Sequence, residues 1–386
     1  MDFSELDFSW IELILLAVFL VAFAFQLYYY VRYFLGIWRH NRRIKKGKVE
    51  YLTNQPPVSI VICARDEEEN LRKFLPFVME QNYRDYEVIV VNDGSMDNTD
   101  DYLSLMTKQY PNLHTTFVPI GATNVSTKKL GLTLGVKAAK YDLILFTDAD
   151  CMPEGADWIS SMVRNFTPTT EFVLGYGGYF KRKGLLNKLI KYDTLFVAIQ
   201  YLGMAAAHRP YMGVGRNLAY RSDTFFRLKG FATTLHVQSG DDDLMVNRGA
   251  TSENTAIEIS KESVTWSEPK KTFMQWFGQK ERHLSVSDQY NSGSKLRLIT
   301  EPVSRGLFYL TFIFVCMFGN IATIGTATFI FIARFVLLLF VINKSAKVLG
   351  ERKFFLTIPL FDIFLPLMTL YILLFGKKKK KDIKWK

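Results

Sequence analysis

Two aspartates one residue apart, in the segment T-D-A-D (147–150), are the residues of this sequence best suited to chemistry. The four apolar residues before them, L-I-L-F (143–146), predict a buried strand. Alternate side chains of an extended segment point the same way, so Asp148 and Asp150 converge on one point. Open α/β sheets bind ligands at this end of their strands, and two hard oxygen donors there suit Mg²⁺ or Mn²⁺ holding a phosphate. The alternative is a solvated turn.

A second group of acids lies about 90 residues later, in S-G-D-D-D-L-M-V-N-R (239–248). Three consecutive aspartates cannot all be buried and ionised without partners, because the cost of desolvation is too high. At least one of them must face a cation, a substrate hydroxyl or water. The competing interpretation is an exposed helix N-terminus, where the helix dipole stabilises acids.

Two further segments carry polar side chains that could bind a ligand. The segment W-F-G-Q-K-E-R-H (276–283) places Gln279, Arg282 and His283 on one helical face beside Trp276. An arginine with an amide and an aromatic ring can bind a diphosphate and stack on a ring, although such a face is more often solvated. The other segment is the glycine-containing polar loop M-G-V-G-R-N-L-A-Y-R (212–221).

These residues need a scaffold, and the sequence predicts one made of alternating strands and helices. The pattern indicates an α/β fold with a parallel, doubly wound sheet. Polar residues follow the first two strands as well, so one rim of the sheet collects Asp66, Glu67 and Asp93 together with the T-D-A-D pair. No dinucleotide-binding or P-loop glycine pattern is present. The predicted strands are 58–63, 87–91, 115–120 and 143–146. One predicted helix ends at about Gln81, a second lies around 128–138, and a third, amphipathic helix covers 185–207.

The N-terminal 50 residues predict a membrane helix. Residues 11–31 are apolar and aromatic except for Glu12 and Gln26, and this length crosses a bilayer. Four acids and no basic residue lie in residues 1–12, whereas seven Lys or Arg follow between residues 32 and 48. This asymmetry places the N-terminus outside and residue 40 onward in the cytoplasm. A cleaved signal peptide would carry its positive charges before the apolar core.

The C-terminal region is also apolar, but its topology is open. Residues 307–342 form a 36-residue apolar stretch that predicts a hairpin turning near Gly319–Asn320. A second apolar segment, 354–375, would then carry the lysine-rich tail outside, against the positive-inside tendency. Either this segment is re-entrant or 307–342 crosses only once, which leaves three or four crossings. Arg334 and Asp362 either pair with each other, line a polar path, or snorkel near helix ends.

Composition supports a membrane protein over other classes. Of the 386 residues, 49% are hydrophobic, and the net charge of +11 is concentrated in two clusters that flank apolar segments. Juxtamembrane placement therefore explains the basic clusters better than a nucleic-acid partner does, and no nucleic-acid binding is expected. The three scattered cysteines, Cys63, Cys151 and Cys316, predict neither a disulfide nor a zinc framework.

Over residues 55–300 the motifs together resemble the inverting family 2 glycosyltransferases with a GT-A fold. They are similar to the membrane-bound bacterial members and, more distantly, to the hyaluronan and cellulose synthases. The order of the motifs carries the resemblance: N-D-G-S (92–95) after the second strand, D-A-D (148–150), G-D-D (240–242) and then Q-x-x-R-H (279–283). Each motif is weak alone, but four in this order are specific.

The resemblance implies roles for individual residues. Asp150 and Asp148 would bind the metal on the donor diphosphate. Aligning the acidic run from its glycine makes Asp242 the general base, whereas aligning from Leu244 selects Asp241. The residues predicted to contact the donor are Ala64, Asp66, Glu67, Asp93, Lys128, Asp148, Gln279 and Arg282, and those predicted for the acceptor are Gly215, Arg216, Asn217 and Trp276.

The resemblance implies a multi-pass enzyme of the cytoplasmic membrane, which transfers sugar with inversion from a nucleotide-sugar donor to a lipid-linked or polysaccharide acceptor. The expected parts are a membrane helix with its basic segment (1–50), a cytoplasmic GT-A domain (51–300) and C-terminal membrane segments (301–386). His283 replaces the Trp of the processive synthases, which favours single addition. The alternatives are a processive synthase and a non-catalytic nucleotide-sugar-binding protein. The sugar, the linkage and the oligomeric state are left open.

Overall fold

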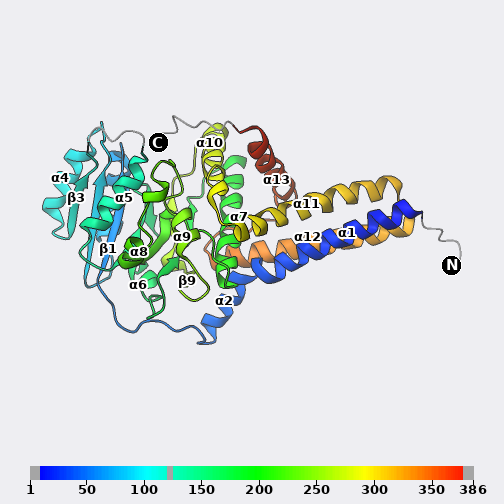
Figure 1. Cartoon of the computed structure of the whole chain (residues 1–386), viewed down its shortest axis with the longest axis horizontal. Coiled ribbons are helices and arrows are strands. Elements are labelled where there is room, and N and C mark those ends of the chain that lie inside the picture. The colour runs from blue at the N-terminus through cyan, green and yellow to red at the C-terminus, as the bar shows by residue number, and fades with distance from the viewer. Residues whose placement is uncertain (1–8, 120–124, 377–386) are drawn as a thin grey trace.

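A computed structural model describes residues 9–119 and 125–376 of the chain. An α/β domain lies at one end of the molecule and a bundle of long helices extends from it at the other (Figure 1). The N-terminal helix and two C-terminal helices form this bundle, so segments about 300 residues apart in the sequence lie side by side.

The α/β domain is built on a seven-stranded sheet with the order β3-β2-β1-β4-β8-β6-β9. The first four strands in this order are parallel, as predicted, and Ala64 at the end of β1 is opposite Asn92 at the end of β2. Strand β8 pairs antiparallel with both β4 and β6, so the sheet is mixed beyond β4. Its strands are β1 (Val58–Ala64), β2 (Tyr86–Asn92), β3 (Leu113–Phe117), β4 (Leu143–Phe146), β6 (Phe172–Leu174), β8 (Leu218–Arg221) and β9 (Thr255–Ile257).

Both faces of this sheet are covered, which explains why its central strands are continuous apolar runs. Ile60 and Ile62 of β1 belong to a cluster that includes residues of α3, α4 and α6. Val61 and Cys63 point to the other face and pack with residues of α5. The doubly wound α/β class predicted from the sequence is confirmed. The covering helices are α3 (Glu68–Met79), α4 (Thr99–Gln109), α5 (Thr127–Ala138) and α6 (Trp158–Val163).

A three-stranded sheet, β5-β10-β7, completes the domain. Strand β5 begins directly after the T-D-A-D segment, so this segment spans the two sheets and is held at both ends. The sheet comprises β5 (Cys151–Pro153), β7 (Gly177–Tyr179) and β10 (Thr265–Ser267), and the shorter helices are α8 (Ser222–Arg227), α9 (Asp243–Gly249) and α10 (Phe273–Leu284).

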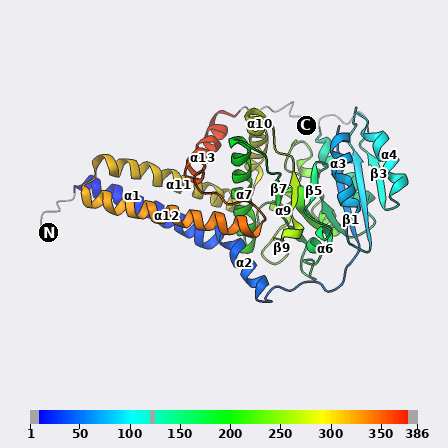
Figure 2. The same ribbon diagram turned by 180° about the vertical axis from the view of Figure 1, so that it is seen from behind.

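Helix α7 (Leu185–Ala206) lies between the α/β domain and the bundle (Figure 2). The sequence predicted an amphipathic helix with many apolar residues here, and most of its side chains are buried, because both the domain and α2 (Gly36–Lys45) pack on it. The approach to α2 is close: a Cβ on Gly36 would lie 2.6 Å from the carbonyl oxygen of Gly203. Only glycine fits at this crossing.

Within residues 9–119 and 125–376, four helices are long and apolar enough to cross a membrane. Helices α1 (Trp10–Tyr29), α11 (Ser292–Phe318) and α12 (Ile321–Val348) run side by side, and α1 continues through a π-helical turn (Tyr30–Phe34) into α2. The turn between α11 and α12 falls at Gly319–Asn320, which confirms the predicted hairpin. Helix α13 (Ile358–Phe375) does not follow the bundle but lies across its domain end beside α10 and α7.

Candidate active site

The two aspartates of the T-D-A-D segment lie together after β4. One oxygen of Asp148, one of Asp150 and the sulfur of Cys151 all lie within 4.8 Å of one another. Burial, followed by the charge of Asp148, raises the pKa of Asp150 to about 6. Burial also raises the pKa of Cys151 well above its usual value, so this residue stays a thiol and is a poor ligand for a hard cation. The two carboxylates therefore provide the donor set, and they fit a divalent metal ion.

Lys128 joins the two acidic segments. Ser126 caps α5 and accepts a hydrogen bond from the backbone N–H of Lys129, which fixes the first turn and with it Lys128. The ammonium group of Lys128 lies 3.2 Å from an oxygen of Asp148 and 3.2 Å from an oxygen of Asp241. Burial alone would lower the pKa of this lysine, but the nearby carboxylates raise it well above its usual value. Lys128 is therefore a fixed positive charge at the centre of the site.

The three consecutive aspartates have three different environments. Asp242 caps α9, and its two carboxylate oxygens accept backbone N–H groups of Gly215 at 2.6 Å and Asp243 at 2.8 Å. Burial, followed by the charge of Asp241, raises the pKa of Asp242 to about 6. Asp241 is also buried, but Lys128 lowers its pKa. Asp243 points inward and accepts a hydrogen bond from the hydroxyl of Tyr290 at 2.9 Å.

One small cavity is lined by residues of both acidic segments, together with Gly215 and Lys128. The apolar side chains of Leu132, Phe146 and Phe231 form the rest of its wall. The structure therefore brings Asp148, Asp241 and Asp242 to one place, although the two segments are about 90 residues apart in the sequence.

The rim residues after β1 and β2 form a second part of the site. The buried carboxylate of Asp93 accepts a hydrogen bond from Thr127 at 2.6 Å and lies 3.7 Å from Arg65. The backbone N–H of Asp93 donates to the carbonyl of Ala64, which is the last residue of β1. Asp66 has a φ of 49°, and its carboxylate accepts the N–H of Met96. The backbone N–H of Glu67 donates to Thr99, so these loops hold one another in place.

The predicted ligand-binding helix face lies on α10. Gln279 donates a hydrogen bond to the hydroxyl of Tyr179 at 3.0 Å, and the guanidinium of Arg216 lies over the same ring at 4.4 Å. Arg216 also acts on Asp150, since its charge opposes the rise in that aspartate's pKa. Arg282 is half-buried on α10 and His283 is exposed. Tyr179 thus connects Gln279 to Arg216, and Arg216 is the residue of this group whose charge acts on Asp150.

Two residues predicted to contact an acceptor are buried in the core. The side chain of Asn217 accepts a hydrogen bond from the indole of Trp158 and donates to the carbonyls of Tyr176 and Ser263. Trp276 is only 2% exposed. Both side chains are therefore enclosed by the core, whereas Gly215 and Arg216 lie next to the site.

Three contributors were not singled out from the sequence. Thr127 orients Asp93, and Tyr290 holds Asp243. Lys129 is fully buried and donates to the carbonyls of Thr234 and Val237, which fixes the loop that leads to Asp241. Two adjacent lysines carry no sequence signal that tells Lys128, which faces the carboxylates, from Lys129, which holds a loop.

The α/β domain is similar to known proteins. Residues 59–222 match the family described as Glycosyl transferase family 2. A 166-residue segment is 25% identical to the poly-beta-1,6-N-acetyl-D-glucosamine synthase of Staphylococcus aureus (strain COL) and covers 40% of this chain and 39% of that protein. The glycosyltransferase AglE of Haloferax volcanii is 29% identical over 122 residues, which are 31% of this chain and 38% of AglE.

The fold extends beyond the matched segment. The mannosyltransferase PcManGT from Pyrobaculum calidifontis, solved in complex with GDP-Man and Mn²⁺, superposes with a TM-score of 0.60 at 18% identity. The superposition covers 95% of this chain and 98% of the mannosyltransferase. The matched curated relatives are longer than the segment shared with them, so their likeness concerns the α/β domain. Taken together, the family match and the shared fold identify residues 59–222 as a family 2 glycosyltransferase domain with a GT-A fold.

Proposed function

We propose that this protein transfers a sugar from a nucleotide-sugar donor to a membrane-bound acceptor with inversion at the anomeric carbon. The observation that carries this proposal is the single cavity lined by Asp148, Lys128, Asp241 and Asp242. Its wall contains Asp148, one of the two acids suited to a metal–diphosphate, and Asp242, a carboxylate suited to proton transfer. Inverting transfer needs both within reach of one carbon.

The donor half of the site is made of Asp148, Asp150 and Asp93. We add Arg216 to it, although the sequence assigned this residue to the acceptor, because its charge acts on Asp150. Mg²⁺ or Mn²⁺ held by Asp150 and Asp148 would supply positive charge to the diphosphate leaving group. Asp93, fixed by Thr127, would contact the nucleoside, with Ala64, Asp66 and Glu67 beside it. Gln279, Arg216 and Arg282 would contact the donor phosphates or sugar.

The acceptor half contains the base, and the structure favours Asp242 over Asp241. Asp241 is neutralised by Lys128, which makes it a weak base. Asp242 has a pKa near 6 and is oriented by two backbone N–H groups, so it is ionised and fixed at neutral pH. In the reaction the acceptor oxygen bonds to the anomeric carbon, its proton moves to Asp242, and the bond from that carbon to the diphosphate oxygen breaks.

The acceptor is expected to be lipid-linked or part of a glycan, because the domain is joined to helices that can span a membrane. We place the domain on the cytoplasmic side of the cytoplasmic membrane, since seven basic residues follow the first apolar segment. A processive synthase is the second candidate, and the similarity to a poly-N-acetylglucosamine synthase favours it. The two are distinguished by the length of the product.

The test is donor turnover by the full chain in detergent with Mn²⁺ and a panel of nucleotide sugars that includes GDP-mannose and UDP-N-acetylglucosamine. Release of nucleoside diphosphate is measured for wild type, for Asp150→Asn and for the exposed control Asp101→Asn. We expect one donor to be turned over, with loss in Asp150→Asn and none in Asp101→Asn. Failure of every donor to turn over with a lipid-phosphate acceptor present would instead favour a non-catalytic nucleotide-sugar-binding protein.

A further inference from the structure

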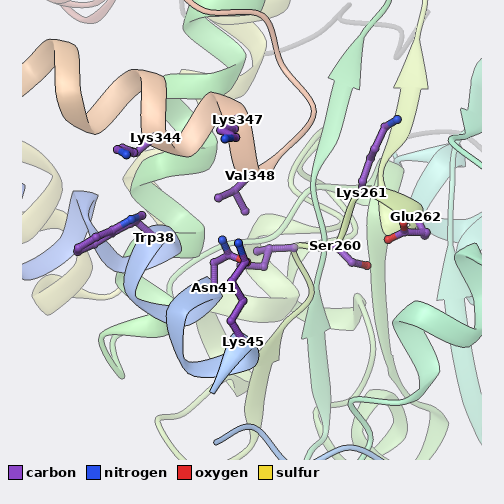
Figure 3. Close-up of a pocket in the computed structure, with 10 residues that line it drawn as sticks. Trp38, Asn41, Lys45, Ser260, Lys261, Glu262, Lys344, Lys347 and Val348 are labelled. Carbon is purple, nitrogen blue, oxygen red and sulfur yellow. The ribbon is translucent and has the colours of Figure 1, made fainter. Parts of the chain in front are cut away.

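A second pocket lies where the helix bundle meets the α/β domain, and none of its residues lines the cavity described above (Figure 3). Its volume is about 380 Å³. Trp38, Asn41 and Lys45 come from α2, and Lys344, Lys347 and Val348 come from the end of α12. The loop after β9 closes it with residues 259–262.

The surface of α12 shows where the bilayer ends relative to this pocket. Ile332, Val336 and Phe340 are exposed apolar side chains four residues apart, so they form one lipid-compatible stripe along the helix. Lys344 continues the same stripe one turn later, about 6 Å further along the axis. The boundary between hydrocarbon and headgroups therefore falls between Phe340 and Lys344.

An aromatic residue from α2 lies at the same level. The indole of Trp38 contacts the ring of Phe340 at a centroid distance of 6.1 Å, edge to face. Tryptophan is enriched at this depth because its ring suits the interface between hydrocarbon and water. The pocket mouth thus opens at the headgroup layer on the side of the α/β domain.

The charge of the pocket is positive. Lys261 is paired with Glu154 at 3.2 Å, so its charge is already balanced. The exposed ammonium groups of Lys45, Lys344 and Lys347 remain, against the single carboxylate of Glu262. Figure 3 shows Glu262 at the far side of the pocket from the two lysines of α12. A basic pocket between membrane helices at the bilayer surface suits a phosphate-bearing headgroup.

We propose that this pocket binds the phosphate headgroup of an anionic phospholipid. The lysines of α12 and α2 contact the phosphate, Asn41 offers a further hydrogen-bond donor, and Trp38 and Phe340 contact the start of the acyl chains. Such a lipid bridges α2 and α12, which reach the domain from opposite ends of the sequence. It therefore fixes the domain at the membrane surface, independently of what the domain transfers.

The test is native mass spectrometry of the full chain released from phosphatidylcholine nanodiscs that contain a minor fraction of phosphatidylglycerol. Wild type is expected to retain phosphatidylglycerol over phosphatidylcholine. The double variant Lys344→Gln/Lys347→Gln is expected to lose about tenfold or more of this preference, since each lysine at an anionic surface contributes roughly fivefold to affinity. Lys344 and Lys347 are exposed, as are the two lysines of the control variant described below. Circular dichroism checks that each variant is folded.

The matched control is Lys46→Gln/Lys48→Gln, which removes the same charge from the same juxtamembrane region outside the pocket. It is expected to keep the preference within about threefold. The proposal would be overturned if the pocket variant kept the wild-type preference for phosphatidylglycerol. It would also be overturned if the pocket and control variants lost this preference to the same extent. Inorganic phosphate and glycerol phosphate form a separate arm: if either stabilises the detergent-solubilised protein as much as phosphatidylglycerol does, the site binds soluble phosphate and the lipid assignment is wrong.

Discussion

Two clusters of charged side chains in this protein differ in how their charge is balanced. One lies at the domain end of the helix bundle and contains Glu301, Arg305, Arg334 and Asp362, all at most 5% exposed. The other lines the cavity of the α/β domain. Both bury ionised groups, which costs free energy unless the charges are compensated.

The bundle cluster is neutral within itself. Arg334 lies 2.8 Å from Asp362, and Arg305 lies 2.9 Å from Asp362 and 2.8 Å from Glu301. The amide of Gln26 accepts a further hydrogen bond from Arg334 at 3.0 Å. Two acids and two arginines thus connect α1, α11, α12 and α13, and the pairing of Arg334 with Asp362 allowed by the sequence is confirmed.

The site cluster has an excess of negative charge. Its four carboxylates, those of Asp148, Asp150, Asp241 and Asp242, face three cations, Lys128, Lys129 and Arg216. The raised pKa values of Asp150 and Asp242 reflect this excess together with burial. A self-neutral cluster fixes the register of helices, whereas a cluster with unbalanced charge is built to receive a ligand of opposite sign. Within one molecule, the buried charges of the bundle cluster thus serve the structure, and those of the site cluster serve the function.

The largest expected effect is on turnover at the site. Replacing Asp242 by Asn keeps the shape and an acceptor for one of the two backbone N–H groups but removes the base, so we expect kcat to fall by about 10²- to 10⁴-fold. The measurement is nucleoside diphosphate release, with donor affinity measured separately by calorimetry and expected to change little. Full turnover in this variant, with loss in Asp241→Asn, would move the base to Asp241.

The next effect is on stability and concerns the bundle. Arg334→Met leaves Asp362 buried with only Arg305 and Tyr309 as partners, which we expect to cost about 3–5 kcal/mol of unfolding free energy. Denaturation in detergent provides the measurement. The double variant Arg334→Met/Asp362→Leu keeps the neutral Glu301–Arg305 pair and should recover most of the loss. No recovery in the double variant would show that the cluster is not held together by charge balance.

Much of the fold was predictable because the sequence patterns that specify it are local. The β-branched runs predicted β1, β2 and β4 to within one residue, and Gly319–Asn320 marked the hairpin between α11 and α12. The third strand was predicted at 115–120 but is Leu113–Phe117, because its alternating, half-exposed residues give a weak edge-strand pattern; Ile120 lies outside the described residues.

The site was predictable as a set of motifs, but not as an arrangement. The sequence placed acids at the ends of β1, β2 and β4, yet it could not show that Lys128 bridges Asp148 and Asp241. It also could not separate Asn217, which is buried in the core, from its neighbours Gly215 and Arg216. These distinctions depend on contacts between segments far apart in the chain, which leave no local pattern.

A smaller effect concerns metal affinity. Asp150→Asn removes one of two carboxylates from the proposed metal site, and we expect Mn²⁺ to bind at least about 10- to 100-fold more weakly, since even indirect partners of a metal have effects of that size. Electron paramagnetic resonance of free Mn²⁺ measures the change without any need for turnover. The exposed control Asp101→Asn should bind Mn²⁺ as wild type does. Equal binding by both variants would remove Asp150 from the metal site.

The smallest effect is a pH dependence that distinguishes the two clusters. Because the pKa values of Asp150 and Asp242 are raised to about 6, the folded state binds protons more tightly than the unfolded state does. These two groups therefore stabilise the fold at low pH, and that contribution is lost as the pH rises from about 4 through about 6.

A divalent cation in the site would offset this loss, since it stabilises the ionised carboxylates. Protonation competes with the metal below about pH 6, so Mn²⁺ should bind about tenfold more weakly at pH 5 than at pH 7.5. The increase in melting temperature caused by Mn²⁺ should accordingly be larger at pH 7.5, and it should persist in the Arg334→Met/Asp362→Leu variant. If Mn²⁺ raised the melting temperature equally at both pH values, the excess charge of the site would be balanced by something other than a cation. The contrast with the self-neutral bundle cluster would then fail.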